Sequence, residues 1–172
     1  MIALALLVAL AFGEDTTSTL HITGREPDRT ATLDCATDPC ARALPAASRF
    51  EHAVAKPYMV GMDRDGEIVG WVGLSTDLTT VKGYSGKPLH TVVGIDTDGQ
   101  ITGGKVVHHS EPILLVGIPE TKLVAFVDAH AGIRADQKVV IGRSADDAVH
   151  VDAISGATVT VLAESRTILE TA

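Results

Sequence analysis

The sequence predicts an α+β domain in which antiparallel hairpins form a sheet and helices pack against it. Two segments rich in Val and Ile are each divided by an Asp-x-Asp-Gly turn, at residues 63–66 and 96–99. Such turns are typical of tight connections between antiparallel strands. Apolar residues recur with helical spacing at 120–131 and from residue 159 onward. The chain has 172 residues, of which 45% are hydrophobic, so a single domain with its own core is expected.

The N-terminal segment predicts export. Residues 1–13 form an apolar run without a charged side chain. This run is too short to cross a bilayer as a helix, but it has the length of the hydrophobic region of a secretory signal peptide. A buried N-terminal strand or helix is the alternative. Residues 14–45 are polar, so we expect a loosely structured extension with a short strand at 18–22, followed by the folded domain at 46–172.

Two cysteines, Cys35 and Cys40, fall within this extension. An even number of cysteines in an exported chain favours a disulfide. Free thiols and a metal site are the alternatives. The neighbouring Asp34 and Asp38 are hard oxygen donors that pair poorly with thiolates, which argues against a metal.

The folded part begins with helix-forming composition at residues 46–55, where Phe50 and Val54 have i, i+4 spacing. The elements expected after it are strands at 58–62, 67–74, 89–95 and 100–108, a helix at 120–131, strands at 138–141 and 149–151, and a helix from 159 to the end. The last helix has no Gly or Asn stop signal, which suggests that the chain was once longer.

The two Asp-x-Asp-Gly turns also raise the possibility of calcium loops. At the spacing of an EF-hand, Gly61 and Gly94 would occupy the first ligand position, which requires an oxygen donor. We therefore expect turns without a metal. Trp71, in the first hairpin, is expected in the core.

Charge and aromatic content exclude one class of function. The formal net charge is −8, and aromatic residues make up only 3% of the chain. A phosphate backbone requires clustered Lys and Arg, and single-stranded nucleic acid requires stacking platforms. We therefore expect no nucleic-acid partner.

The motif with the sharpest chemical content is the run 152–158, Asp-Ala-Ile-Ser-Gly-Ala-Thr, which leads into the last helix. Free N–H groups at a helix N-terminus favour an anion, and Gly156 permits a close approach to the backbone. The hydroxyl of Thr158 would stand where a phosphate group is stabilised. Alternatively, Ser155 is an ordinary N-cap and Thr158 a neutral residue of the first turn.

This run resembles the flavinylation motif of the FMN-binding domain family, Asp-x-x-Ser-Gly-Ala-Thr. The family includes subunits of the sodium-pumping quinone reductase, and a flavin transferase moves FMN from FAD onto the last Thr of the motif. The resemblance implies that Thr158 carries covalent FMN through a phosphoester. The recognition sequence that it assigns to the transferase consists of Asp152, Ser155, Gly156 and Ala157.

Three further segments narrow the resemblance: 83–88, 108–113 and 117–120. They are similar to the N-terminal domain of NosR-like proteins, the regulatory and electron-donating membrane proteins of the nitrous-oxide reductase system. The resemblance covers roughly residues 50–169. In that family, transmembrane helices and cysteine-rich iron–sulfur segments follow the exported domain, and these 172 residues include neither.

The resemblance also implies a flavin environment in the middle of the chain, formed by Tyr84, Ser85, His109, Glu111 and Pro112. From the residues alone, Tyr84 and Ser85 could equally form a turn in a Gly-rich loop. His108, His109 and Glu111 could form the polar end of a hairpin. A metal site there would need a third ligand, which is not evident.

We therefore expect an exported electron-carrying flavoprotein domain with FMN attached to Thr158. The sequence shows no general base paired with a nucleophile, so a substrate-level enzyme is not expected. The expected partners are a flavin transferase and a redox protein such as nitrous-oxide reductase, with membrane association only if the chain is a fragment of a membrane protein. The alternatives are an exported binding or assembly module that carries no flavin, or an FMN-carrying domain of a quinone-reductase or flavin-dependent reductase complex.

Overall fold

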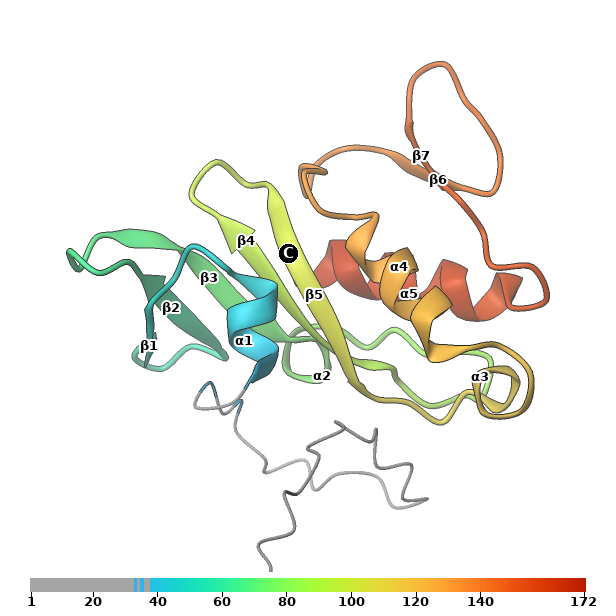
Figure 1. Ribbon diagram of the computed structural model, residues 1–172, viewed down its shortest axis with the longest axis horizontal. Coiled ribbons are helices and arrows are strands. Elements are labelled where there is room, and N and C mark those ends of the chain that lie inside the picture. The colour runs from blue at the N-terminus through green and yellow to red at the C-terminus, as the bar shows by residue number, and fades with distance from the viewer. Residues whose placement is uncertain (1–32, 34, 36–37) are drawn as a thin grey trace, which may run out of the picture.

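A five-stranded antiparallel sheet organises the computed structural model, which describes residues 33, 35 and 38–172 (Figure 1). The strands are β1 (Arg49–His52), β2 (Tyr58–Met62), β3 (Ile68–Leu74), β4 (His90–Asp96) and β5 (Ile101–His108). Their order in the sheet follows the sequence, β1-β2-β3-β4-β5. The predicted fold class, an antiparallel sheet with packed helices, is therefore confirmed. The predicted signal peptide at 1–13 and the strand at 18–22 lie outside the described residues.

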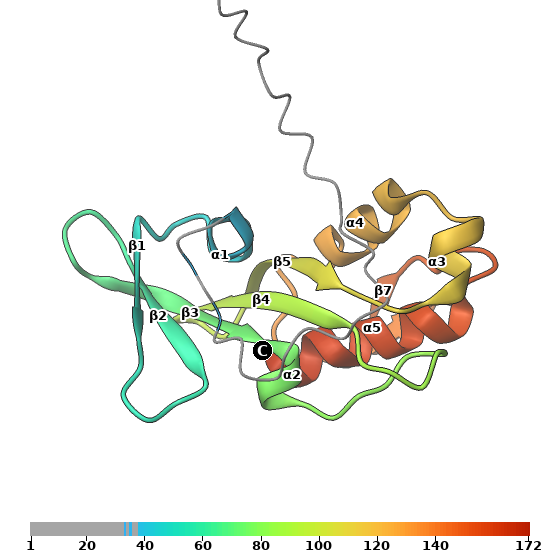
Figure 2. The same cartoon turned by 90° about the horizontal axis from the view of Figure 1, so that it is seen from below.

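Helices cover both faces of the sheet. The helices are α1 (Asp38–Ala43), α2 (Ser75–Leu78), α3 (Pro112–Val116), α4 (Glu120–Asp128) and α5 (Thr158–Thr171). Figure 2 shows α1 on one face, and α2 and α5 on the other. Helix α4 lies against the edge strand β5 and also contacts α5. Within the described residues, no helix is long and apolar enough to span a membrane.

Between α4 and α5, the chain forms a separate parallel pair, β6 (Val139–Ile141) and β7 (Val149–Val151). These strands, together with α4 and α5, correspond closely to the predicted elements. The core that surrounds α5 includes Val93 and Ile101 of the sheet, Phe126 of α4, and Val161 and Ile168 of α5. The last helix is therefore packed along its length against the sheet and α4.

The two Asp-x-Asp-Gly turns form as predicted. The carboxylate of Asp63 accepts hydrogen bonds from the N–H groups of Asp65 and Glu67, both at 2.9 Å. Asp96 does the same in the second turn, at 2.9 and 2.8 Å. Both first aspartates are thus engaged within their own turns. Among the residues that the structure describes, no group of three or more His, Cys, Asp or Glu side chains could hold a metal ion.

Helix α1 packs closely on strands β4 and β5. A side chain at Gly94 would collide with the carbonyl oxygen of Ala43, so glycine permits this approach. Cys40, Ala43 and Leu44 are fully buried there. The prediction of loose structure up to residue 45 is therefore wrong for residues 38–45, because their apolar side chains complete a core over β3 and β4.

The structure confirms the predicted disulfide between Cys35 and Cys40. The two cysteines are only 5 positions apart. The small loop limits the constraint on the unfolded chain, so we expect reduction to lower the free energy of unfolding by about 2 kcal/mol. Urea unfolding with and without a thiol reductant measures this difference. A variant with both cysteines replaced by alanine should not respond to the reductant, and an unchanged wild-type midpoint would contradict the prediction.

The helix predicted at 46–55 is wrong. The structure has strand β1 there, paired antiparallel with β2. Phe50 packs against the core below α1, whereas Val54 is 92% exposed, so the two residues do not share a buried face. Pairing at the sheet edge has overridden the local helix propensity.

Trp71 also differs from expectation, because it is half-buried and lines a pocket on the α5 side of the sheet.

Candidate functional site

The run 152–158 forms the connection between β7 and α5. Ala157 is the N-cap of α5 and Thr158 is its first residue. The buried side chains of Ile154 and Ala157 anchor the run, whereas Thr158 is exposed. Ser155 is therefore not the N-cap. Within the described part of the chain, no side chain caps this helix, and its first N–H groups are open to an anion.

The backbone beside Thr158 is open as well. Gly156 has a φ of +86°, a conformation that other L residues rarely adopt. A Cβ built on Gly156 would have no described heavy atom within 4 Å. An exposed hydroxyl, uncapped N–H groups and a glycine facing open space fit the attachment of a bulky phosphate ester. Ser155 and Asp152 are also exposed, and Asp152 lies 3.7 Å from the His150 imidazole.

Glu111 connects two predicted site segments. It is fully buried, and its carboxylate accepts hydrogen bonds from the N–H groups of Tyr84 (3.1 Å) and Ser85 (3.0 Å). The hydroxyl of Thr160, in the first turn of α5, also donates to it. Burial alone would raise the pKa of Glu111, but these hydrogen bonds outweigh burial and hold the pKa below its ordinary value. The carboxylate thus ties the loop 83–87 to the N-terminal turn of α5.

Exposed apolar and aromatic side chains lie near the connection between the loop 83–87 and α5. Figures 1 and 2 place α3 and the loop after α2 near the N-terminal end of α5. The exposed apolar or aromatic residues on these segments are Tyr84, Leu115, Val116, Val159 and Leu162. Pro112, the first residue of α3, is exposed too. These side chains offer the kind of surface that a planar aromatic group covers.

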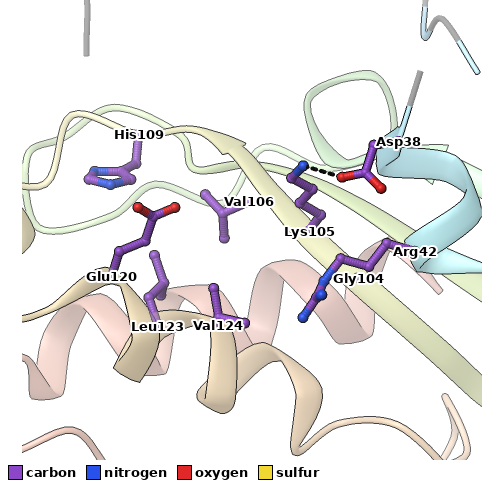
Figure 3. Close-up of a pocket in the computed structure, with 9 residues that line it drawn as sticks. All are labelled: Asp38, Arg42, Gly104, Lys105, Val106, His109, Glu120, Leu123 and Val124. Atoms are coloured by element: carbon purple, nitrogen blue, oxygen red, sulfur yellow. Dashed lines mark hydrogen bonds and ion pairs between the residues drawn. The ribbon is translucent and has the colours of Figure 1, made fainter. Parts of the chain in front are cut away.

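His109 has a different setting. Its ring is buried, and its Nδ1 accepts a hydrogen bond from the N–H of Glu111 at 3.3 Å. Burial and the neighbouring His108 lower its pKa, so the ring is neutral at pH 7. The ring lines a cavity of about 220 Å³ between α1, β5 and α4, where it faces Glu120 (Figure 3). The described residues that line this cavity include none from the run 152–158 or the loop 83–87.

Two buried polar pairs in the structure were not predicted from the sequence. Glu164 of α5 is fully buried and accepts a hydrogen bond from the Thr91 hydroxyl at 2.7 Å. The imidazole of His130 bridges the Phe126 carbonyl oxygen and the Ser165 hydroxyl, both at 2.9 Å. Since a carbonyl oxygen only accepts, His130 Nδ1 carries the hydrogen and Nε2 accepts from the serine.

One signal in the sequence could have indicated these residues. Thr160 and Glu164 have i, i+4 spacing and flank Val161 and Ile168 on the helical wheel. A helix with an apolar stripe this wide places adjacent polar residues at the boundary of the core. Their partners lie far away in sequence and leave no local pattern.

Comparison with known proteins assigns the chain to a family. The profile of the FMN-binding domain family matches residues 83–168, which is half of the chain. This chain therefore belongs to the FMN-binding domain family, as its motif predicts.

Within that family, the chain is similar to the regulatory protein NosR of Pseudomonas aeruginosa, with 41% identity over 133 residues, covering 77% of this chain and 19% of the relative. NosR of Stutzerimonas stutzeri is 42% identical over 107 residues (62% and 15%), and NirI of Paracoccus denitrificans is 36% identical over 89 residues (52% and 13%). The chain thus spans less than a fifth of the length of these relatives. The crystal structure of Shewanella oneidensis NqrC aligns with a TM-score of 0.49 and 20% identity, over 74% of this chain and 66% of that chain.

Proposed function

We propose that this domain carries FMN covalently on Thr158 and transfers electrons. The observation that carries the proposal is the position of Thr158, an exposed hydroxyl at the uncapped N-terminus of α5, in a chain of the FMN-binding domain family. When bound, FMN supplies the redox chemistry through its isoalloxazine ring. The protein supplies attachment, orientation and electrostatic surroundings.

Attachment forms one bond and breaks another. The Thr158 oxygen binds the phosphorus on the FMN side of the FAD pyrophosphate, AMP leaves, and the hydroxyl proton passes to solvent. Exposure of Asp152, Ser155 and Gly156 supports recognition of this run by a flavin transferase. The phosphodiester that results is anionic, and the first N–H groups of α5 and the helix dipole stabilise it.

The remaining residues of the proposed site position the flavin. Glu111 holds the loop that carries Tyr84 and Ser85 against the first turn of α5. The exposed apolar side chains of α3 and α5 would shield an aromatic ring held beside them from water. His109 contributes to the proposed flavin site through its Nδ1, which accepts a hydrogen bond from the N–H of Glu111.

We further propose that residues 1–13 direct the domain to the periplasm or outside the cell. The resemblance to NosR-like proteins supports a place in denitrification, with nitrous-oxide reductase or a protein that serves it as the redox partner. Membrane association would depend on segments of a longer protein.

Intact mass of the mature protein, co-expressed with a flavin transferase in an exporting host, tests the proposal. We expect a gain of one FMN minus one water, located on the peptide that contains Thr158. An unmodified mass, with the transferase active on a control protein, would contradict covalent attachment. The domain would then be a non-covalent binder or an assembly module.

A further inference from the structure

A line of buried polar residues runs along one face of α5. Thr160, Glu164 and Thr167 are each at most 1% exposed. The Thr167 hydroxyl has no hydrogen-bond partner among the described residues, and Glu164, the titratable member of the line, has only one of its two carboxylate oxygens satisfied. The Thr91 hydroxyl donates to Oε1, whereas Oε2 has no hydrogen-bond partner among the described residues. An ionised carboxylate in this position would be costly, since an unpaired charge would be held away from water.

The surroundings of Glu164 oppose its ionisation. The elements packed against α5 include α2, β4 and α4. Their titratable or charged residues are Asp77 of α2, His90 and Asp96 of β4, and Glu120, Lys122 and Asp128 of α4. Glu111 before α3 and His130 after α4 also reach the helix, through Thr160 and Ser165. Burial raises the pKa of Glu164, the hydrogen bond from Thr91 opposes the rise, and the charge of Glu111 adds to it, which brings the pKa to about 7. Glu164 therefore changes its protonation state near neutral pH.

Glu164 is also linked to the attachment end of α5. Thr160 lies one turn before Glu164 and donates to Glu111, which in turn holds the backbone of Tyr84 and Ser85. Two buried carboxylates thus lie beneath the first turns of the helix that begins with Thr158. The protein interior screens charge less than water does, so a charge gained at this end of α5 acts on both carboxylates.

We propose that Glu164 is a redox-linked proton site, which binds one proton from solvent when a flavin held at the N-terminal end of α5 gains an electron. This inference rests on the proposed function. The electron comes from the redox donor protein, and the proton forms an O–H bond at the unpartnered Oε2 of Glu164. When the electron leaves, the O–H bond breaks and the proton returns to solvent. The net charge of the domain then stays constant, and electron affinity and proton affinity rise together.

The first experiment needs no flavin. In protein made without the transferase, the pKa of Glu164 is about 7 in the folded state and about 4.5 in the unfolded chain. Between these two pH values, folded Glu164 keeps a proton that the unfolded chain has released. Wild-type stability should therefore contain a component that falls as pH rises through this window. Glu164→Gln should lack that component. Glu170→Gln, an exposed position on the same helix, should retain it. An identical pH profile for wild type and Glu164→Gln would overturn the assignment of a proton to Glu164.

The second experiment measures the midpoint potential of the flavin-bearing protein between pH 5 and pH 9. We expect an inflection near pH 7 in wild type and Glu170→Gln that is absent in Glu164→Gln. Thr91→Val provides an independent variant, because loss of its hydrogen bond should move the inflection to higher pH. Superimposable profiles for all variants would overturn the coupling. If the intact mass of the wild-type protein showed no bound FMN, the proposed function itself would be wrong. The coupling depends on that function and would fail with it.

Discussion

Thr158→Ala is expected to abolish covalent flavin and to leave the fold intact. Alanine lacks the oxygen that would form the phosphoester, so no transferase activity can compensate for the change. Thr158 is exposed and begins α5, where alanine has a slightly higher helix propensity than threonine. The free energy of unfolding should therefore change by less than about 0.5 kcal/mol. Intact mass and flavin fluorescence of the denatured protein measure the loss.

Thr121→Ala provides the matched control. Thr121 is an exposed threonine in the first turn of another helix, α4, but no flavinylation motif precedes it. This variant should carry as much FMN as the wild type. If the intact mass of the Thr158→Ala variant still included one covalently bound FMN, the prediction would be contradicted. Peptide mapping would then show whether the neighbouring hydroxyl of Ser155 is the attachment point.

The hairpins could be predicted because their turns are encoded locally. The Asp63 and Asp96 carboxylates each bond N–H groups two and four residues further along, so a short run of sequence contains the whole interaction. The same holds for the run 152–158, whose small residues and following helix are adjacent in sequence. Such local features made the hairpins of the sheet and the start of α5 predictable from the sequence.

The errors arose where partners are distant. Residues 46–55 have helical composition, but pairing with β2 determines their structure. Residues 38–45 end a stretch, 14–45, that is polar overall, but the disulfide and the approach of α1 to Gly94 order them. Glu164 and Thr91 are 73 positions apart, so no local pattern could reveal their hydrogen bond. Glu111 entered the predicted site only through resemblance, and its role in joining a loop to α5 required the fold.

Glu111→Gln is expected to destabilise the domain by about 2–4 kcal/mol at neutral pH. Glu111 accepts hydrogen bonds from two backbone N–H groups and one hydroxyl in a fully buried position. A glutamine of the same shape replaces one accepting oxygen with an NH₂ group, which would face a donor. Urea unfolding measures the loss. Glu67→Gln, at an exposed turn position, should change stability by less than about 0.5 kcal/mol.

The pH dependence of the destabilisation by Glu111→Gln distinguishes the contribution of the Glu111 charge from that of its shape. The hydrogen bonds hold the pKa of Glu111 in the folded state below its value in the unfolded chain. The stabilisation is therefore present above the ordinary carboxyl pKa and is lost as pH falls through the folded-state pKa. The difference between wild type and Glu111→Gln should shrink on acidification. A difference that is constant with pH would mean that packing, and not the ionised carboxylate, holds the loop 83–87 against α5. Because the same contact positions the first turn of α5, a variant that loses it should also accept less FMN on Thr158.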